Sequence, residues 1–169
     1  MYQLAVYIHL LAAVVWLGGM LFLAVVLVPV TRSIQHPPGT GARILGAAAR
    51  RFRIVAWVAI LTLGVTGLWL LLQRGVSLSA IFTGAGWFIQ VLRLKTGLFL
   101  AIVVLSALHD FILGPQLARR LEELGRSASS DPHVLRKRKM VSWLARVNLA
   151  LTLGAVALAV LLLRRPPLE

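Results

Sequence analysis

The sequence predicts an all-α protein, a polytopic integral membrane four-helix bundle. Of its 169 residues, 59% are hydrophobic and only 14% are charged, whereas a soluble domain carries about 25% charged residues. The mean hydropathy is +0.88. Four apolar segments are each near the ~20 residues that a helix needs to cross ~30 Å of hydrocarbon. Because backbone groups in lipid must hydrogen-bond within their own segment, each segment is expected to be a helix.

The four helices are expected at residues 4–29, 54–73, 91–114 and 143–163, within a single transmembrane domain that covers residues 1–169. The first segment lacks the basic start and the cleavage site of a signal peptide, so it is expected to remain as a helix. Residues 40–52 and 116–124 are suited to helical extensions, whereas Gly114-Pro115 predicts a break or kink. The apolar, glycine-rich segment 75–90 is expected to lie along the outer interface. No internal repeat is evident.

The charge distribution predicts the orientation in the cell (inner) membrane. The net charge is +13, and the basic residues gather in the first and third loops. By the positive-inside rule these loops are cytoplasmic, so both termini lie outside. We interpret the basic runs as topology signals attracted to anionic lipid, not as a nucleic-acid site. The chain has no cysteine, which excludes disulfides, thiolate metal sites and c-type haem attachment.

Two ionisable residues lie near the outer face within apolar segments. An imidazole in lipid, such as His9, is costly unless it has a role or a partner. It is either a ligand or an interfacial histidine bonded to a carbonyl group. Lys95 either faces the bundle interior or extends to the outer surface. Both lie about four residues from the outer ends of their helices, ~6 Å deep, so we expect them to share one site.

A second polar cluster is expected at the inner face. Asp110 follows His109 inside the third apolar segment and needs a cation, for which Arg53 and Arg146 are the candidates at that level. The cluster is either an ion pair that holds helices together or a proton relay or second cofactor site. His109 lies ~21 Å along the helix from Lys95, so His109 and His9 cannot bind one metal.

Helical spacing predicts which side chains face the interior. Residues three, four or seven apart lie on one face of a helix, and a stripe of polar and aromatic residues on an apolar helix should face its neighbours. The expected stripes contain His9, Ala13, Trp16 and Met20 on the first helix, Thr62, Thr66, Trp69 and Gln73 on the second, and Lys95, Ile102, Ser106 and His109 on the third. Gly18, Gly19, Gly64 and Gly67 should let backbones approach closely.

Several short motifs resemble one membrane-protein family over nearly the whole chain. They are the run from Tyr7 to Phe22, Phe52-Arg53, Thr66-Gly67-Leu68-Trp69, the run from Leu92 to Leu98, and Leu108-His109-Asp110-Phe111. Their order and spacing are similar to the copper-resistance D domain (CopD) family. Its superfamily includes the HemJ-type protoporphyrinogen oxidases, and resemblance to that branch implies a b-type haem that depends on a helix-one histidine and a helix-three lysine. His9 and Lys95 match those positions.

Two functions of different classes follow. The first is binding of haem b between helices 1 and 3 near the outer face, for electron transfer or porphyrin oxidation, which would make the chain a haem-dependent oxidoreductase. His9 and Lys95 would be the iron ligands, and Arg93 and Arg74 would hold the propionates. The alternative is copper uptake or copper resistance. Because Cu(I) favours cysteine and methionine and the chain has no cysteine and three methionines, haem is favoured.

The remaining alternative is a structural or accessory subunit that binds neither haem nor copper. The lipid bilayer is the predicted partner in every case. A redox partner or a second copy of the chain would complete an electron-transfer function, and no nucleic acid is expected.

Overall fold

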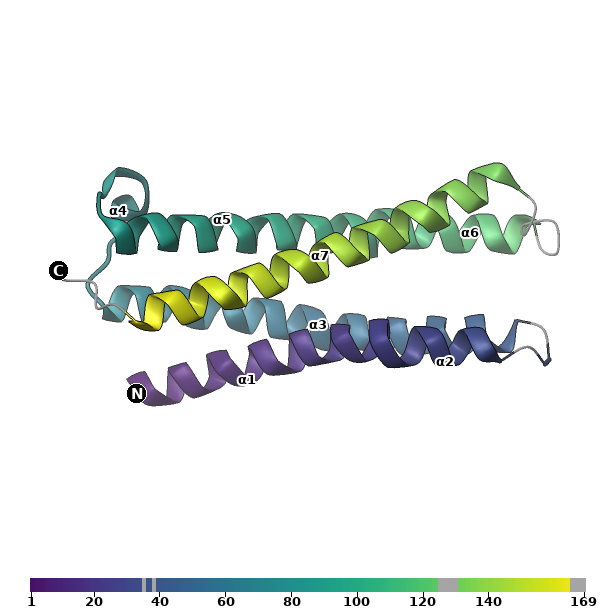
Figure 1. Ribbon diagram of the computed structural model, residues 1–169, viewed down its shortest axis with the longest axis horizontal. Helices are drawn as coiled ribbons and strands as arrows, with labels where there is room; N and C mark the ends of the chain where they lie inside the picture. Colours follow the sequence, from purple (N-terminus) through teal and green to yellow (C-terminus); the bar gives the residue numbers. More distant parts are fainter. Residues whose placement is uncertain (35, 38, 125–130, 165–169) are drawn as a thin grey trace. The chain divides into compact units, whose positions relative to one another are not determined.

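The computed structural model describes residues 1–169 except residues 35, 38, 125–130 and 165–169. Every regular element in this part of the chain is a helix (Figure 1). Four helices are long and apolar enough to cross a membrane: Tyr2–Ser33, Thr40–Gln73, Trp87–Leu121 and Pro132–Leu162. The prediction of an all-α membrane protein with four spanning helices is therefore confirmed.

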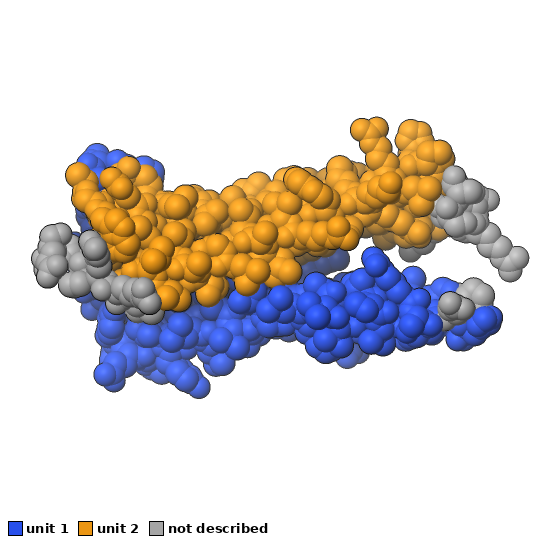
Figure 2. Space-filling view, viewed as in Figure 1, with its two compact units in different colours: residues 1–84 blue, residues 85–169 orange. Residues whose placement is uncertain are grey.

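Contacts between residues divide the chain into two compact units, Met1–Gly84 and Ala85–Glu169. Figure 2 colours these units separately. Each unit contains two long helices that run in opposite directions and pack against each other. In each, the first long helix contains a π-helical segment.

The first hairpin begins with α1 (Tyr2–Leu21), which continues through the π-helix η1 (Phe22–Leu27) into α2 (Val28–Ser33). Helix α3 (Thr40–Gln73) returns along it, after Gly39. The φ of Gly39 is 83°, in the left-handed region that glycine adopts without steric cost. The short helix α4 (Leu78–Thr83) follows and is capped by the Ser77 hydroxyl, which accepts a hydrogen bond from the Ala80 N–H at 3.2 Å.

Glycine lets the helices of the first hairpin come close at two levels. A Cβ on Gly19 would overlap the ring of Phe52, and a Cβ on Gly41 would overlap the carbonyl oxygen of Thr31. At Gly18, by contrast, a Cβ would meet nothing within 4 Å. The expectation of close packing is thus confirmed for Gly19, whereas Gly18 faces open space. Small residues at helix contacts are a general device of membrane proteins.

The second hairpin is built from α5 (Trp87–Ala107), the π-helix η2 (Leu108–Leu113), α6 (Gly114–Leu124) and α7 (Pro132–Arg164). Its core contains Ile102 of α5, which is fully buried, and Thr152 of α7, which is 2% exposed. The Thr152 hydroxyl donates to the carbonyl oxygen of Asn148 at 2.8 Å. This bond satisfies a buried polar group within its own helix.

Each π segment is followed by a proline. Proline has no N–H, and its ring clashes with the carbonyl group four residues earlier. That carbonyl belongs to Val25 for Pro29 and to Phe111 for Pro115, so both carbonyls lie inside a π segment. The wider π turn accommodates the ring, and the helix continues. Of the expected break or kink at Gly114-Pro115, the break is therefore wrong, because the helix passes through this position into α6. The kink stays a prediction.

Each π segment forms a joint with the proline that follows it, and the two joints recur at one fixed offset along the chain. The π segments start at residues 22 and 108, and the prolines are residues 29 and 115, so both pairs differ by 86 positions. The hydrogen bonds that close the two segments show the same offset. The Val28 N–H donates to the Leu23 carbonyl, and the Gly114 N–H donates to the His109 carbonyl. The order of elements thus repeats, although the sequence shows little identity at this offset.

The helices extend beyond the apolar segments. Helix α3 starts at Thr40, as residues 40–52 suggested, and α6 includes residues 116–124. Helix α5 starts at residue 87 instead of 91, and α7 at residue 132 instead of 143. Lysine and arginine favour helix nearly as well as leucine does. A basic segment at the head-group level therefore continues the helix that an apolar segment begins.

Candidate functional site

His9 forms a hydrogen-bonded pair with Thr66 in the first hairpin. His9 lies in α1 and Thr66 in α3, and the distance from Nδ1 to Oγ1 is 2.7 Å. The Thr66 hydroxyl donates its single proton to the carbonyl oxygen of Thr62 in its own helix. With that proton on the carbonyl, the Thr66 oxygen accepts from His9, which is the tautomer with the ring proton on Nδ1. In this neutral tautomer Nε2 is the basic nitrogen, the atom that a metal ion takes.

Gly67 makes room for the imidazole beside Thr66. A Cβ at this position would lie 3.3 Å from Cε1 of His9 and 3.9 Å from its Nδ1. Contacts as short as the first are tighter than ordinary van der Waals separations. Glycine therefore sets the closeness of α3 to the ring, and Thr66 sets the orientation of the ring. Two adjacent residues of α3 thus define where the ring lies.

The end of the first hairpin that holds the N-terminus also contains Arg74. Its Nε donates to the hydroxyl of Tyr2 at 3.1 Å, which joins the end of α3 to the start of α1. His9 lies seven positions after Tyr2, about 10 Å further along the helix. Arg74 is exposed, and a guanidinium has five N–H donors in all. Its predicted place near the outer face of the membrane stays a prediction.

Lys95 and Arg93 belong to α5 of the second hairpin. Lys95 is half-buried and Arg93 is exposed. Lys95 lies 13 residues before the start of η2, and His9 lies 13 residues before the start of η1. The two residues therefore hold the same position in the two hairpins. Their sharing of one site stays a prediction.

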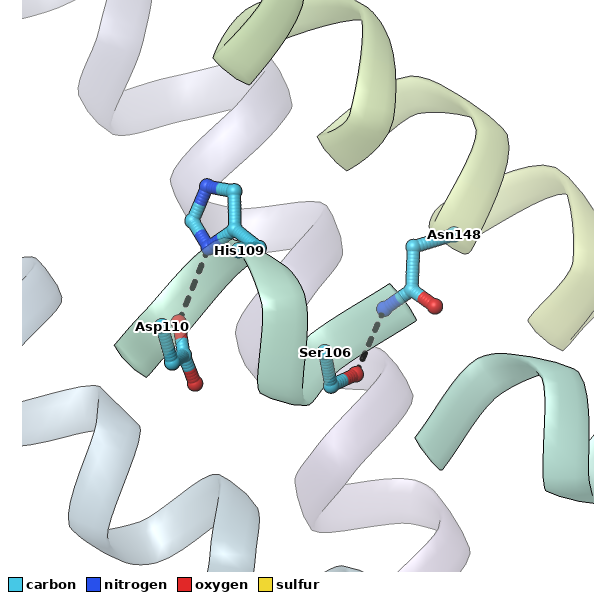
Figure 3. Close-up of polar contacts among 4 residues, drawn as sticks. All are labelled: Ser106, His109, Asp110 and Asn148. Carbon is cyan, nitrogen blue, oxygen red and sulfur yellow. Dashed lines mark hydrogen bonds and ion pairs between the residues drawn. The ribbon is translucent and has the colours of Figure 1, made fainter. Parts of the chain in front are cut away.

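The inner polar cluster has a hydrogen-bonded pair, His109 and Asp110, at its centre. Nδ1 of His109 lies 2.8 Å from Oδ1 of Asp110 (Figure 3). Their side chains are 35% and 18% exposed. Both residues lie in η2, whose π turns shift the phase of the helix after Ser106. Ile102 and Ser106 of the predicted stripe are buried, as expected, and His109 is only partly so.

The cations predicted for Asp110 lie in different hairpins, Arg53 in the first and Arg146 in the second. Nε of Arg53 is buried without a hydrogen-bond partner among the described residues. A buried guanidinium nitrogen of this kind requires an acceptor. Pairing of Asp110 with Arg53 or Arg146 therefore stays a prediction, beside the observed partner His109.

Two positions near these clusters carry polar contacts that sequence reasoning did not assign. Thr66 was placed on a stripe but not paired with His9, and Asn148 was not singled out. Asn148 donates from Nδ2 to Oγ of Ser106 at 3.1 Å, joining α7 to α5 (Figure 3). The signal that could have paired Thr66 with His9 is their similar distance from one end of the hairpin. Thr66 precedes Arg74 by eight residues, and His9 follows Tyr2 by seven.

The described residues hold no cluster of three or more histidine, cysteine, aspartate or glutamate side chains that could bind a metal ion. His9 and His109 are therefore single candidate ligands. The first comes with a fixed tautomer, and the second with a carboxylate on Nδ1. A centre that obtains most of its ligands from a cofactor is consistent with this donor set.

Comparison with known proteins gives two findings. The family model described as copper resistance protein D matches residues 46–162. An uncharacterized protein of Aquifex aeolicus (strain VF5) is 29% identical over 161 residues, which cover 95% of this chain and 94% of the relative. No solved structure matches the chain. The family match covers Lys95 and the inner polar cluster, whereas His9 precedes it.

Proposed function

Because the chain belongs to the copper resistance protein D family, we propose that this multi-pass membrane protein holds a redox-active metal centre through His9. The proposed centre is a b-type haem near the outer end of α1. One observation carries the proposal: Nδ1 of His9 is bound to Thr66. A ligand histidine in proteins typically donates its second ring N–H to such an acceptor, which fixes its orientation and raises its basicity.

The donors in the chain suit a haem better than a copper ion held by side chains alone. Haem brings its own macrocycle and takes only its axial ligands from the protein. Cu(I) prefers several soft ligands, and the chain has no cysteine. The described residues also lack a cluster of three or more imidazole or acidic ligands. A single oriented imidazole is enough for haem.

The remaining predicted residues have defined parts in this proposal. Lys95 would be the second protein ligand of the iron, and it would have to give up its proton to bind. Arg93 and Arg74 hold the propionates, since guanidinium groups pair well with carboxylates. Both arginines are exposed, which suits propionates at the level of the lipid head groups.

A bound haem would supply one-electron transfer. In this proposal Thr66 holds the imidazole proton on Nδ1, and the ring lies partly buried against α3. With a redox partner this arrangement serves electron transfer, and with a porphyrin substrate it serves porphyrin oxidation. Both uses start from His9 as the ligand.

Copper handling is the second candidate, because the family is described by copper resistance. In this case Nε2 of His9 would bind the copper ion directly. Since an imidazole is a good copper ligand, the tautomer fixed by Thr66 serves copper as it serves haem. The two candidates differ in the species bound and not in the residue that binds it.

Absorption spectra of the purified full-length protein test the proposal. We expect a Soret band that sharpens on dithionite reduction after expression with ample haem supply. His9→Ala should lose the bound haem, and His109→Ala, a matched change in the other hairpin, should retain it. Metal analysis of the same samples measures copper.

The outcomes separate the candidates. If the protein binds copper in stoichiometric amount, shows no Soret band and loses the copper in His9→Ala, the centre is a copper site and not a haem. Full haem retention in His9→Ala would contradict the assignment of His9. A wild-type protein with neither haem nor copper would contradict both candidates.

A further inference from the structure

The second hairpin contains a cavity between the end of α6 and the start of α7. Its volume is about 300 Å³, and it is lined by Arg120, Asp131, His133, Val134 and Lys137. Arg120 belongs to α6, and the last three belong to the first two turns of α7. Val134 is 1% exposed and forms the apolar floor.

The charge in this cavity favours an anion. Arg120 and Lys137 are cationic, and Asp131 is the only acid among those lining residues that the structure describes. The Asp131 carboxylate is already engaged, because its Oδ1 accepts from the backbone N–H of His133 at 2.7 Å and of Val134 at 3.3 Å. It caps α7, whose N-terminal dipole it partly neutralises. Two cationic side chains and an imidazole therefore remain to meet a ligand.

Lys137 is held in place from across the cavity. Its Nζ donates to Oε1 of Gln116, in α6, at 3.2 Å. An ammonium group has three donors, so this bond uses one and leaves the group able to bind an anion. Arg120 contributes a planar guanidinium, which can bind two oxygens of one phosphate at once. The cavity thus offers phosphate a bidentate guanidinium and an ammonium group, a combination that suits phosphate oxygens.

The level of the cavity along α7 indicates the source of the anion. Met140 and Trp143 follow Lys137 by three and six positions and are 40% and 62% exposed. These apolar side chains lie in the same candidate membrane span as Lys137, Pro132–Leu162, up to ~9 Å further along the helix toward its more apolar part. Around the cavity, Arg136, Arg138 and Lys139 are all exposed. A basic pocket above an exposed apolar helix face matches an anionic lipid, with head group in the pocket and acyl chains along the helix.

We propose that this cavity binds the phosphate of an anionic phospholipid. Arg120 and Lys137 bind the phosphate oxygens, His133 supports them, and an acyl chain lies along Met140 and Trp143. The site is independent of His9 and of the metal centre proposed above. It would tie the end of the second hairpin to the inner, anionic face of the membrane.

Lipid titration of the full-length protein in detergent, followed by native mass spectrometry, tests this site. Phosphatidylglycerol is compared with zwitterionic phosphatidylcholine of the same acyl chains. The double variant Arg120→Gln/Lys137→Gln removes the cavity cations, and Arg136→Gln/Lys139→Gln removes two exposed cations from the same segment. We expect the cavity variant to bind phosphatidylglycerol about 25-fold more weakly, roughly fivefold for each basic side chain. The control variant should stay within about twofold of wild type.

Three results would overturn the proposal. Equal weakening in both double variants would indicate a general surface charge and no site. Equal binding of the two lipids would exclude recognition of the anionic head group. If inorganic phosphate at constant ionic strength displaces phosphatidylglycerol, and the length of the acyl chains does not change the affinity, the cavity is a site for free phosphate. If the double variant does not fold, the single Lys137→Gln variant should show the fivefold loss, and its absence counts against the site.

Discussion

The Thr66 hydroxyl determines which nitrogen of His9 can meet a metal. Thr66→Val keeps the volume of the side chain and removes the acceptor for Nδ1–H. Partners of ligand histidines typically change metal affinity 10- to 100-fold, so we expect haem or copper binding to weaken at least ~10-fold. Thr66→Ser retains the hydroxyl and should stay close to wild type. Binding titration of the two variants measures the difference, and equal affinities would contradict a positioning role for Thr66.

Gly67 determines how closely α3 approaches the same ring. In Gly67→Ala the added Cβ would lie 3.3 Å from Cε1 of His9, so the ring must shift by a few tenths of an ångström. We expect weaker binding at the His9 centre and an altered absorption spectrum. Gly154→Ala is the matched control, since its Cβ would make only an ordinary contact of 3.8 Å with Leu98. Identical spectra for the two variants would count against close packing at Gly67.

At the scale of single residues, the sequence predicted the unusual residues better than their partners. His9 stands out because an imidazole is costly in an apolar segment. Thr66 does not, since a threonine can bond to its own helix backbone anywhere in a membrane span. The pairing of His9 with Thr66 depends on the register between α1 and α3. Helical periodicity fixes a face of each helix but leaves this register open.

Neighbouring glycines of α1 have opposite environments. A Cβ on Gly19 would overlap the Phe52 ring, whereas a Cβ on Gly18 would meet nothing within 4 Å. We expect Gly19→Ala to be less stable than Gly18→Ala by about 1–3 kcal/mol, the usual cost of overpacking. Thermal unfolding in one detergent compares them, with the gain in helix propensity equal in both. Equal unfolding temperatures would contradict the observed packing of α1 on α3.

The hydrogen-bonded pair of His109 and Asp110 in η2 is expected to stabilise the second hairpin. Asp110→Ala removes the carboxylate that binds His109 at 2.8 Å. A hydrogen bond to a charged group contributes about 1.5–3 kcal/mol, and partial exposure reduces this, so we expect a loss of about 1–2 kcal/mol. Glu123→Ala, an exposed acid of α6, is the control and should change stability little. A variant Asp110→Ala as stable as the control would show that the pair does not stabilise the hairpin.

At the scale of elements, hydropathy predicted the four spanning helices but not their ends or their π segments. Charged residues stop an apolar segment without stopping a helix, so α7 begins well before its apolar part. A π turn needs no particular residue type in its own sequence. Its signal was the proline that follows, which had indicated a break at Gly114-Pro115. The wider turn before Pro115 absorbs the clash that would otherwise cause that break.

The orientation of the whole molecule follows from its charge and awaits a test. Because the chain has no cysteine, single variants Ser79→Cys and Ser33→Cys each carry one thiol, and both positions are exposed. We expect an impermeant maleimide to label residue 79 on intact cells and residue 33 only after permeabilisation. The basic first and third loops require this arrangement. The reverse pattern of labelling would place both termini in the cytoplasm.

At the scale of the whole molecule, hydropathy predicted a membrane protein and the number of its spanning helices, because lipid permits few backbone structures. It did not reveal the division at Gly84, since helices of both hairpins have similar composition. Nor did identity reveal the repeated order of elements. Only the positions of two prolines, Pro29 and Pro115, hinted at it before the π segments were known.

The equal placement of the two π–proline joints has a consequence for backbone hydrogen bonding in lipid. Both joints lie within stretches that are long and apolar enough to cross a membrane, Tyr2–Ser33 and Trp87–Leu121. There a carbonyl group without a donor costs several kcal/mol, and proline has no N–H to donate. A π turn pairs a carbonyl with the N–H five residues later, as Leu23 with Val28 and His109 with Gly114 do. The irregular turn before each proline thus keeps these carbonyls paired without water, which lets a proline stand inside an apolar span.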